Sequence, residues 1–416
     1  MPTSCGSCWR QALRVALLTL MEPAGVDGSA PRGLLRVGGA TLARHQLALA
    51  LSAGCQRIAC LARGIGPDLI ELQHEAEKAG ASFHVIGGAH GLSGLVTAAD
   101  EVMVLAEGLL PTAGDALRLI DGPPAVLVQP SETGVPAGYE RIDLNHASAG
   151  LMIVPGRLAD RLMELPGDSD PGSALMRIAL QAGVAQRPVP DEVRLGGRWL
   201  LVRSEAEAHD AEEGWMARQT AGGARTPGPL LARTLVRQFG PALLHGGRSS
   251  LIGAGTAVVL AALGLALAWF GWGAPGLLLA GAGWVLQRAS TMLDRVRREA
   301  LAQRAGPLWR SGVFDLGFDA VIAAILVIAV PALPGQLVIE RCFAPAMLIG
   351  LLRLLPRGFT SGWSVWAEDR LTLTVLLAAM FAGKVIQPGV PALAALLLLA
   401  GLVLSREGNG QRLTRA

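Results

Sequence analysis

Three aspartates beside strongly apolar segments are the residues of this chain best placed to do chemistry. Asp315 and Asp319 are one helical turn apart, so a helix would put both side chains on one face. Asp294 belongs to the preceding segment, whose apolar part ends near Leu286. A carboxylate in a membrane span costs roughly 2.5–3.5 kcal/mol on insertion scales, so three of them at one membrane face indicate a function. Carboxylates that converge beside an apolar wall suit a divalent cation and a phosphate ester, which predicts metal-dependent phosphate transfer.

The spacing of these aspartates resembles the CDP-alcohol phosphotransferase motif, D-x-x-D-G-x-x-A-R, eight residues, then G-x-x-x-D-x-x-x-D. On this sequence the motif puts its first aspartate at Asp294 and its last two at Asp315 and Asp319. Arg297 replaces the second aspartate, and Arg298 replaces the glycine that follows it. The resemblance implies that Asp294 and Asp315 bind Mg²⁺ or Mn²⁺. It also implies that Asp319 is the general base on an acceptor alcohol.

Arginines near the aspartates are candidates for phosphate binding. Arg297 and Arg298 would supply positive charge in place of a second metal ion or contact the donor phosphate directly. Arg310 precedes Asp315, and Arg353 lies near the inner end of a later apolar segment, where it would bind a lipid phosphate.

Apolar segments that could cross a membrane are needed to position these residues. Six are predicted, at 251–272, 274–290, 312–333, 337–355, 371–387 and 389–405. Arginines cluster between the second and third segments, Arg357 and Arg370 lie between the fourth and fifth, and the connections FGWGAP and PALPG carry no charge. The positive-inside rule therefore predicts a multi-pass protein of the cytoplasmic membrane, with both termini and the aspartates on the cytoplasmic side.

Residues 227–246 form an amphipathic pattern before the first apolar segment. Leu231, Leu235 and Phe239 recur every fourth residue, and Arg233 and Arg237 lie elsewhere on the same helix. The pattern predicts an interfacial helix whose arginines meet lipid phosphates. The alternative is a helix that packs on the soluble domain.

The first half of the chain has the pattern of an α/β domain. RVALLTL at 14–20 has strand length, a helix is predicted over 41–53, and another buried strand over 57–61. Further strands are predicted at 83–87, 102–106, 125–129, 150–154 and 199–203. Strand, helix and strand in this order predict a doubly wound parallel sheet with its ligand outside the carboxyl ends of the strands. His45 is predicted on the polar face of the first helix.

The run PRGLLRVGG at 31–39 resembles the P-K-x-L-L-x-V-x-G run of sugar-phosphate nucleotidyltransferases. Gly25 and Gly28 could form a backbone nest for an anion, and Arg32 stands at the lysine position of that family. The family's phosphate loop, G-x-G-x-R, is missing from 21–30. Its strand-end aspartate falls at Gly108 or, with a slip of one residue, at Glu107. The resemblance implies the framework of a nucleotidyltransferase and leaves its activity open.

Composition indicates the class of protein and excludes some partners. A mean hydropathy of +0.43 favours an integral membrane protein, and a net charge of +3 with no basic arm argues against a nucleic-acid partner. Cys5 and Cys8 have metal-ligand spacing, but a second pair is missing, so a reduced pair in the tail is expected. The N-terminus lacks the pattern of a signal peptide.

The predicted organisation is an α/β doubly wound cytoplasmic domain followed by an all-α six-helix transmembrane domain. Its parts are a tail at 1–9, the α/β domain at 10–205, a linker at 206–226, the interfacial helix at 227–246, the membrane domain at 247–406 and a tail at 407–416. The predicted function is a phosphotransferase of lipid headgroup synthesis, which moves a phosphoalcohol or phosphatidyl group from a CDP-activated donor to an alcohol. The alternative is a catalytically degenerate scaffold in a lipid pathway. Its expected partners are membrane lipid, the small-molecule alcohol or the activated donor. The resemblance to the CDP-alcohol phosphotransferases also implies that the chain forms a homodimer.

Overall fold

The chain divides into two compact units, residues 1–216 with 297–304 and residues 217–296 with 305–416. The computed structural model describes residues 13–25, 30–167, 169–221, 226–244, 249–300, 309–330, 337–358 and 364–412. Side chains are described except at 219–221, 240–244, 249–252, 296–300, 309–311, 357–358, 364 and 404–412. The division after Met216 falls inside the predicted linker.

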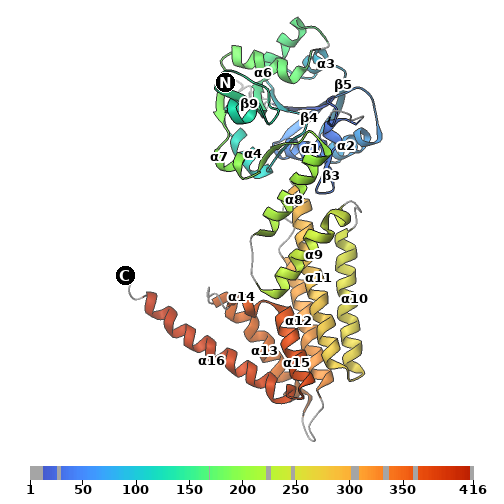
Figure 1. Ribbon diagram of the computed structural model, residues 1–416, viewed down its shortest axis with the longest axis vertical. Helices are drawn as coiled ribbons and strands as arrows, with labels where there is room; N and C mark the ends of the chain where they lie inside the picture. Colours follow the sequence, from blue (N-terminus) through green and yellow to red (C-terminus); the bar gives the residue numbers. More distant parts are fainter. Residues whose placement is uncertain are drawn as a thin grey trace, which may run out of the picture. The chain divides into compact units, whose positions relative to one another are not determined.

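A mixed sheet forms the centre of the first unit (Figure 1). Within the described residues its strand order is β10–β8–β9–β6–β1–β4–β5. The strands are β1 (Arg14–Leu20), β4 (Cys55–Ala62), β5 (Ser82–Ile86), β6 (Glu101–Leu105), β8 (Ala125–Pro130), β9 (His146–Pro155) and β10 (Ala185–Pro188). The pairs β1–β4, β1–β6, β4–β5 and β8–β10 are parallel, whereas β9 runs antiparallel to β6 and β8. The prediction of a parallel sheet is therefore wrong at β9, which enters the sheet between two strands of the other direction.

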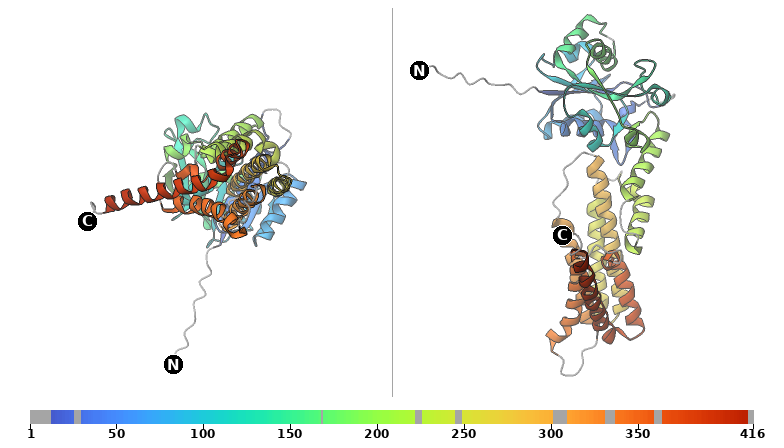
Figure 2. Two further views of the ribbon diagram at one scale, coloured as in Figure 1. Left: turned by 90° about the horizontal axis from the view of Figure 1, so that it is seen from below. Right: turned by 90° about the vertical axis from the view of Figure 1, so that its left-hand side faces the viewer.

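Helices cover both faces of this sheet (Figure 2, right). One face packs against α1 (Leu42–Ser52), α2 (Pro67–Lys78) and α4 (Ala113–Ile120), and the other against α3 (Ala89–Ser93), the 3₁₀ helix η2 (Gly156–Glu164) and α6 (Pro171–Gln181). Side chains of β1 alternate between the two cores, with Ala16 and Leu18 on one side and Val15 and Leu17 on the other. This alternation of an apolar strand buried on both faces confirms the doubly wound α/β arrangement.

Short elements complete the first unit. The strands β2 (Arg36–Val37) and β3 (Ala40–Thr41) form a hairpin, and β7 (Leu109–Pro111) pairs with β11 (Trp199–Leu201). The 3₁₀ helix η1 (Arg32–Leu34) and the helices α5 (Ser131–Gly134) and α7 (Asp191–Leu195) lie in connections.

Helix α8 (Glu205–Ala221) begins at the last residue of the predicted α/β domain, continues into the predicted linker and packs on the β2–β3 hairpin. Glu212 accepts a hydrogen bond from the Gly38 amide at 3.0 Å, and the Trp215 ring fills the space where Gly38 lacks a Cβ. His45 meets the same ring edge to face at 5.5 Å and is 6% exposed. The prediction that His45 faces solvent is therefore wrong, because α8 covers that side of α1.

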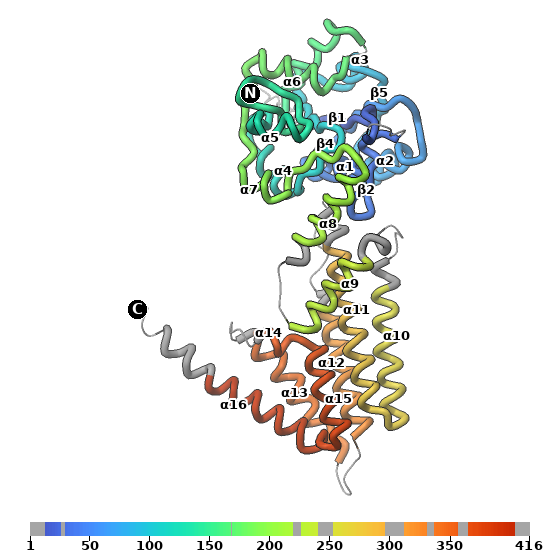
Figure 3. The backbone as a smooth tube through the Cα atoms, in the orientation of Figure 1, coloured from blue at the N-terminus to red at the C-terminus, as the bar shows by residue number. Residues whose placement is uncertain are grey.

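The second unit is helical (Figure 3). Its elements are α9 (Pro227–Leu244), α10 (Ser249–Trp269), α11 (Gly273–Ala300), α12 (Trp309–Ala329), α13 (Val338–Gly358), α14 (Ser364–Ala367), α15 (Arg370–Ala382) and α16 (Ile386–Arg412). Helices α10 and α11 approach closely at glycines, since a Cβ on Gly264 would lie 2.5 Å from the Gly276 carbonyl oxygen. Small residues of this kind allow apolar helices to pack backbone to backbone.

Each of the six predicted spans overlaps mainly one helix of this unit, although the span at 371–387 runs past the end of α15 into α16. Among the described residues, two stretches are long and apolar enough to cross a membrane, Gly312–Ala329 and Ile386–Val403. Two shorter apolar stretches are Gly253–Trp269 and Arg370–Ala382. The helical class of the second half is thus confirmed, while six membrane crossings remain a prediction.

Candidate functional site

Asp319 on α12 is the centre of a buried ion-pair cluster in the second unit. It is 2% exposed. Arg370 at the start of α15 donates from Nε to Oδ1 at 2.6 Å and from Nη2 to Oδ2 at 3.2 Å. Arg353 of α13 donates from Nε to Oδ2. Both carboxylate oxygens are therefore engaged by guanidinium groups from two other helices.

The cluster carries one negative and two positive groups. Arg370 is 7% exposed, and its Nη1 also donates to the Ala367 carbonyl at 2.6 Å. Arg353 Nη2 is buried without a hydrogen-bond partner among the described residues. A buried ion pair that loses one member leaves an uncompensated charge, so Asp319 stabilises the arrangement of α12, α13 and α15.

Asp315, one turn before Asp319, has a different environment. It is half-buried, and its Oδ1 accepts a hydrogen bond from Trp284 Nε1 of α11 at 3.3 Å. Asp294 is also half-buried, near the end of α11. The structure thus joins Asp319 to Arg353, both predicted site residues, and joins Asp315 to a tryptophan.

The fit to Mg²⁺ or Mn²⁺ is poor in the part of the chain that the structure describes. No group of three or more His, Cys, Asp or Glu side chains there could hold a metal ion. Asp319 gives both oxygens to arginines, which repel a cation. The side chains of Arg297, Arg298 and Arg310 lie outside the described residues.

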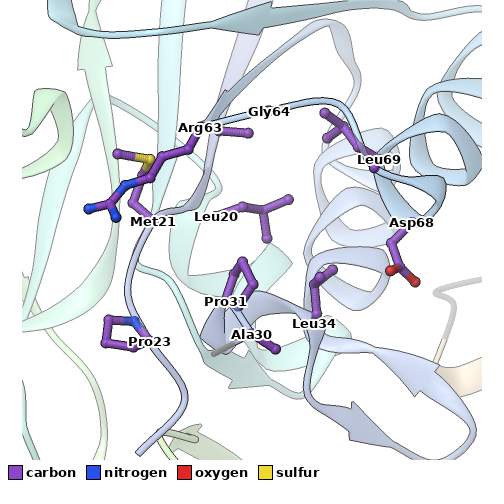
Figure 4. Close-up of a pocket in the computed structure, with 12 residues that line it drawn as sticks. Leu20, Met21, Pro23, Ala30, Pro31, Leu34, Arg63, Gly64, Asp68 and Leu69 are labelled. Atoms are coloured by element: carbon purple, nitrogen blue, oxygen red, sulfur yellow. The ribbon is translucent and has the colours of Figure 1, made fainter. Parts of the chain in front are cut away.

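A cleft of about 540 Å³ opens at the carboxyl ends of β1 and β4 in the first unit (Figure 4). Leu20 and Met21 line it from the end of β1, Arg63 from the end of β4, and Asp68 from the first turn of α2. The chain runs from β1 to β4 on one side and later returns to β6 on the other side of β1. Such a change of direction creates a crevice where α/β domains bind ligands.

Glu107, two residues after the end of β6, fixes the loop beside this cleft. It is 5% exposed. Its Oε2 accepts hydrogen bonds from the amides of Met21 and Glu22 at 2.7 and 2.8 Å, and Oε1 accepts one from Gly33 at 3.0 Å. Burial raises the pKa of Glu107 by more than these amides lower it. The carboxylate therefore holds the two ends of the 21–33 loop together.

The predicted anion loop is also committed to internal contacts. The Gly25 amide, at a φ of +72°, donates to the Arg203 carbonyl at 2.8 Å, and Gly28 lies outside the described residues. Arg32 Nη1 pairs with Glu22 at 2.7 Å. The Arg32 stem packs against Gly108, where a Cβ would lie 2.5 Å from its Cδ. The Gly25 amide and the Arg32 guanidinium therefore bind other groups of the protein in place of an anion.

Several residues of these sites were not predicted. The sequence pattern places Arg370 only among the loop charges, although an arginine beside an apolar segment requires a partner. Asp369 belongs to no site motif, although an aspartate just before an apolar run is a helix start signal. Arg63 and Asp68 had no motif to mark them.

Comparisons with known proteins give structural likeness only. No protein-family model and no curated protein matches the sequence. Among solved structures, the UDP-glucose pyrophosphorylase from Acinetobacter baumanii is 14% identical, with a TM-score of 0.37, over 50% of this chain and 94% of that chain. The inositol-1-phosphate CTP transferase from T. maritima is 14% identical, with a TM-score of 0.36, over 49% and 96%. A UDP-glucose pyrophosphorylase complexed with UDP-glucose is 12% identical, with a TM-score of 0.36, over 50% and 99%.

Proposed function

We propose that this chain is a membrane-embedded scaffold of a lipid pathway, with a ligand-binding α/β domain and without phosphotransferase turnover. The observation that carries this proposal is the engagement of both Asp319 oxygens by Arg353 and Arg370. A general base must reach the alcohol proton with a free oxygen, directly or through one water. Here that would require breaking a buried ion pair, which is costly.

The sequence around Asp319 supports the same reading. Arg297 and Arg298 replace a ligand and a glycine of the motif that the segment resembles. Positive charge at those places opposes a second metal ion. In the first unit, Glu107 holds the 21–33 loop, while the cleft between Arg63 and Asp68 remains open to a small polar molecule. The proposal keeps the multi-pass topology with cytoplasmic termini.

An active phosphotransferase is the second candidate, and one observation favours it. Arg353 Nη2 is buried next to Asp319 with no partner among the described residues, and a phosphate oxygen would satisfy it. In that case Asp294 and Asp315 would hold the cation, and the ion pairs of Asp319 would open when substrate binds. This candidate requires turnover that depends on Mg²⁺ or Mn²⁺.

Complementation of a strain that lacks this chain distinguishes the two candidate functions. Asp315→Asn keeps an oxygen that accepts the Trp284 bond but removes a metal ligand. A scaffold with this change should restore the lipid composition fully, and the purified full chain in nanodiscs should give no release of CMP from CDP-activated lipids. Divalent-dependent CMP release that Asp315→Asn abolishes, together with failed complementation, would overturn the proposal.

A further inference from the structure

Asp369 joins the beginnings of two helices in the second unit. It is 1% exposed and caps α15, accepting from the amides of Leu371 and Thr372 at 3.0 and 3.3 Å through Oδ1. Its Oδ2 accepts from the Thr372 hydroxyl and from the Gly228 amide of α9, both at 2.9 Å. Capping of α15 needs only the local bonds. The bond to Gly228, distant in sequence, ties α9 to the same carboxylate.

Gly228 fits this place because it lacks a side chain. A Cβ there would lie 2.3 Å from Asp369 Oδ1 and 2.7 Å from Cζ3 of Trp284. The carboxylate cannot turn away easily, since its own helix holds both oxygens. The first turn of α9 therefore rests directly on Asp369 and Trp284.

Each of the two contacts of Gly228 is connected by a hydrogen bond to an acidic residue of α12. Trp284 donates its indole N–H to Asp315 at 3.3 Å. Arg370, the residue after Asp369, donates to Asp319 at 2.6 Å. Gly228 thus contacts Trp284, which is bonded to Asp315. It also contacts Asp369, whose neighbour Arg370 is bonded to Asp319.

We propose that Gly228 and Asp369 form a latch that couples the docking of α9 to the positions of Asp315 and Asp319. Opening the Asp319 ion pairs frees the start of α15 and releases the first turn of α9. Conversely, lifting α9 loosens Arg370 and Trp284. This coupling goes beyond the proposed function, because it holds for a site that turns over substrate and for one that does not. Such coupling is reciprocal by linkage.

Hydrogen exchange on the full chain in nanodiscs tests the first direction. Asp319→Asn should speed exchange of the amides at 226–232 about tenfold, the scale set by losing roughly one buried hydrogen bond. Exchange in α16 should stay unchanged. If Asp319→Asn does not fold, Arg370→Lys replaces it in the same test, because it keeps the positive charge beside Asp319 but loses the paired guanidinium bonds. Unchanged exchange at 226–232 in the folded variant, with faster exchange at 364–372, would show that the ion pair is local and would overturn the latch.

A double-mutant cycle tests the reverse direction. Gly228→Ala forces a Cβ onto Asp369, whereas Gly317→Ala is the matched control, because a Cβ on Gly317 of α12 meets nothing within 4 Å. The shift in unfolding midpoint caused by Asp319→Asn should be clearly smaller in the Gly228→Ala background and unchanged in the Gly317→Ala background. Additive shifts in both backgrounds would refute the coupling.

Discussion

Glu107 in the first unit and Asp319 in the second are both buried carboxylates at motif positions, yet different kinds of hydrogen-bond donor hold them. Within the described residues, the donors to Glu107 are backbone amides, from Met21, Glu22 and Gly33. The donors to Asp319 in the same part of the chain are guanidinium groups, from Arg353 and Arg370. The first carboxylate shapes a loop beside an open cleft, and the second joins helices through charge. A carboxylate at a motif position is therefore available for chemistry only if its oxygens are not needed by the fold.

The energetic consequence differs between the two. The amides that lose their acceptor when Glu107 is removed are neutral, so no uncompensated charge is left behind. Of the two arginines that pair with Asp319, Arg370 is 7% exposed, so its guanidinium cannot be hydrated without opening the packed apolar helices, whereas Arg353 is partly exposed. The comparison predicts a larger loss of stability at Asp319 than at Glu107.

The largest effect is expected from Asp319→Ala. It leaves the buried Arg370 and the partly buried Arg353 without their shared carboxylate and should lower the free energy of unfolding of the helical half by about 3–5 kcal/mol. Chemical unfolding in mixed micelles, followed by circular dichroism at helical wavelengths, measures this. Asp315→Ala is the control, because it removes a single bond from a half-buried carboxylate. Equal losses in the two variants would contradict the assigned role of Asp319.

A smaller effect is expected from Glu107→Gln. The amide keeps one acceptor oxygen but turns an NH₂ toward backbone N–H groups, so the α/β half should lose about 1–3 kcal/mol in urea unfolding. Glu101→Gln is the matched control, because Glu101 pairs with Arg14 at a half-exposed site. A control loss as large as the Glu107 loss would mean that the loop does not depend on its buried carboxylate.

The pH dependence of the same variant sharpens the comparison. Because the folded-state pKa of Glu107 is raised, the folded chain holds this proton more tightly than the unfolded chain. The native glutamate therefore contributes most below the ordinary glutamate pKa, about 4.3, and loses stability as pH rises through its folded-state pKa. The stability advantage over Glu107→Gln should shrink across that interval. An advantage that grows with pH there would contradict the raised pKa.

The smallest effect is expected from Asp315→Ala. The buried Trp284 ring keeps its packing against Gly228 and Arg288, and the 3.3 Å bond from its indole N–H to Asp315 is lost. The cost should be about 0.5–1.5 kcal/mol in the same micelle titration. A loss as large as that of Asp319→Ala would place Asp315, and not Asp319, at the centre of the cluster.

Periodicity allowed much of the fold to be predicted. The run at 14–20 is β1, the predicted helix at 41–53 contains α1, and each of the six apolar segments overlaps a helix of the second unit. Short elements were missed, because β7 and β10 are too short to show alternation. His45 was placed wrongly because the helix that covers it, α8, lies far away in sequence.

The candidate sites were less predictable, for a physical reason. Spacing showed that Asp315 and Asp319 share a helix, but it could not show which oxygens other helices would occupy. Arg353 was assigned to phosphate, and the structure pairs it with Asp319. Arg370 and Asp369 lie next to each other in the chain and serve Asp319 and Gly228, respectively. Such pairings depend on helix packing, which one sequence does not encode locally.

The glycine crossing of α10 and α11 bears on how the helical half is built. Gly264 and Gly276 bring the two backbones together, each within 2.5 Å of where the other would carry a methyl group. A short connection joins these helices, so the pair can form before the later helices are synthesised. The resulting hairpin would act as a preassembled template for the later helices, and a bulkier residue at either glycine should lower the yield of folded protein before it affects any ligand.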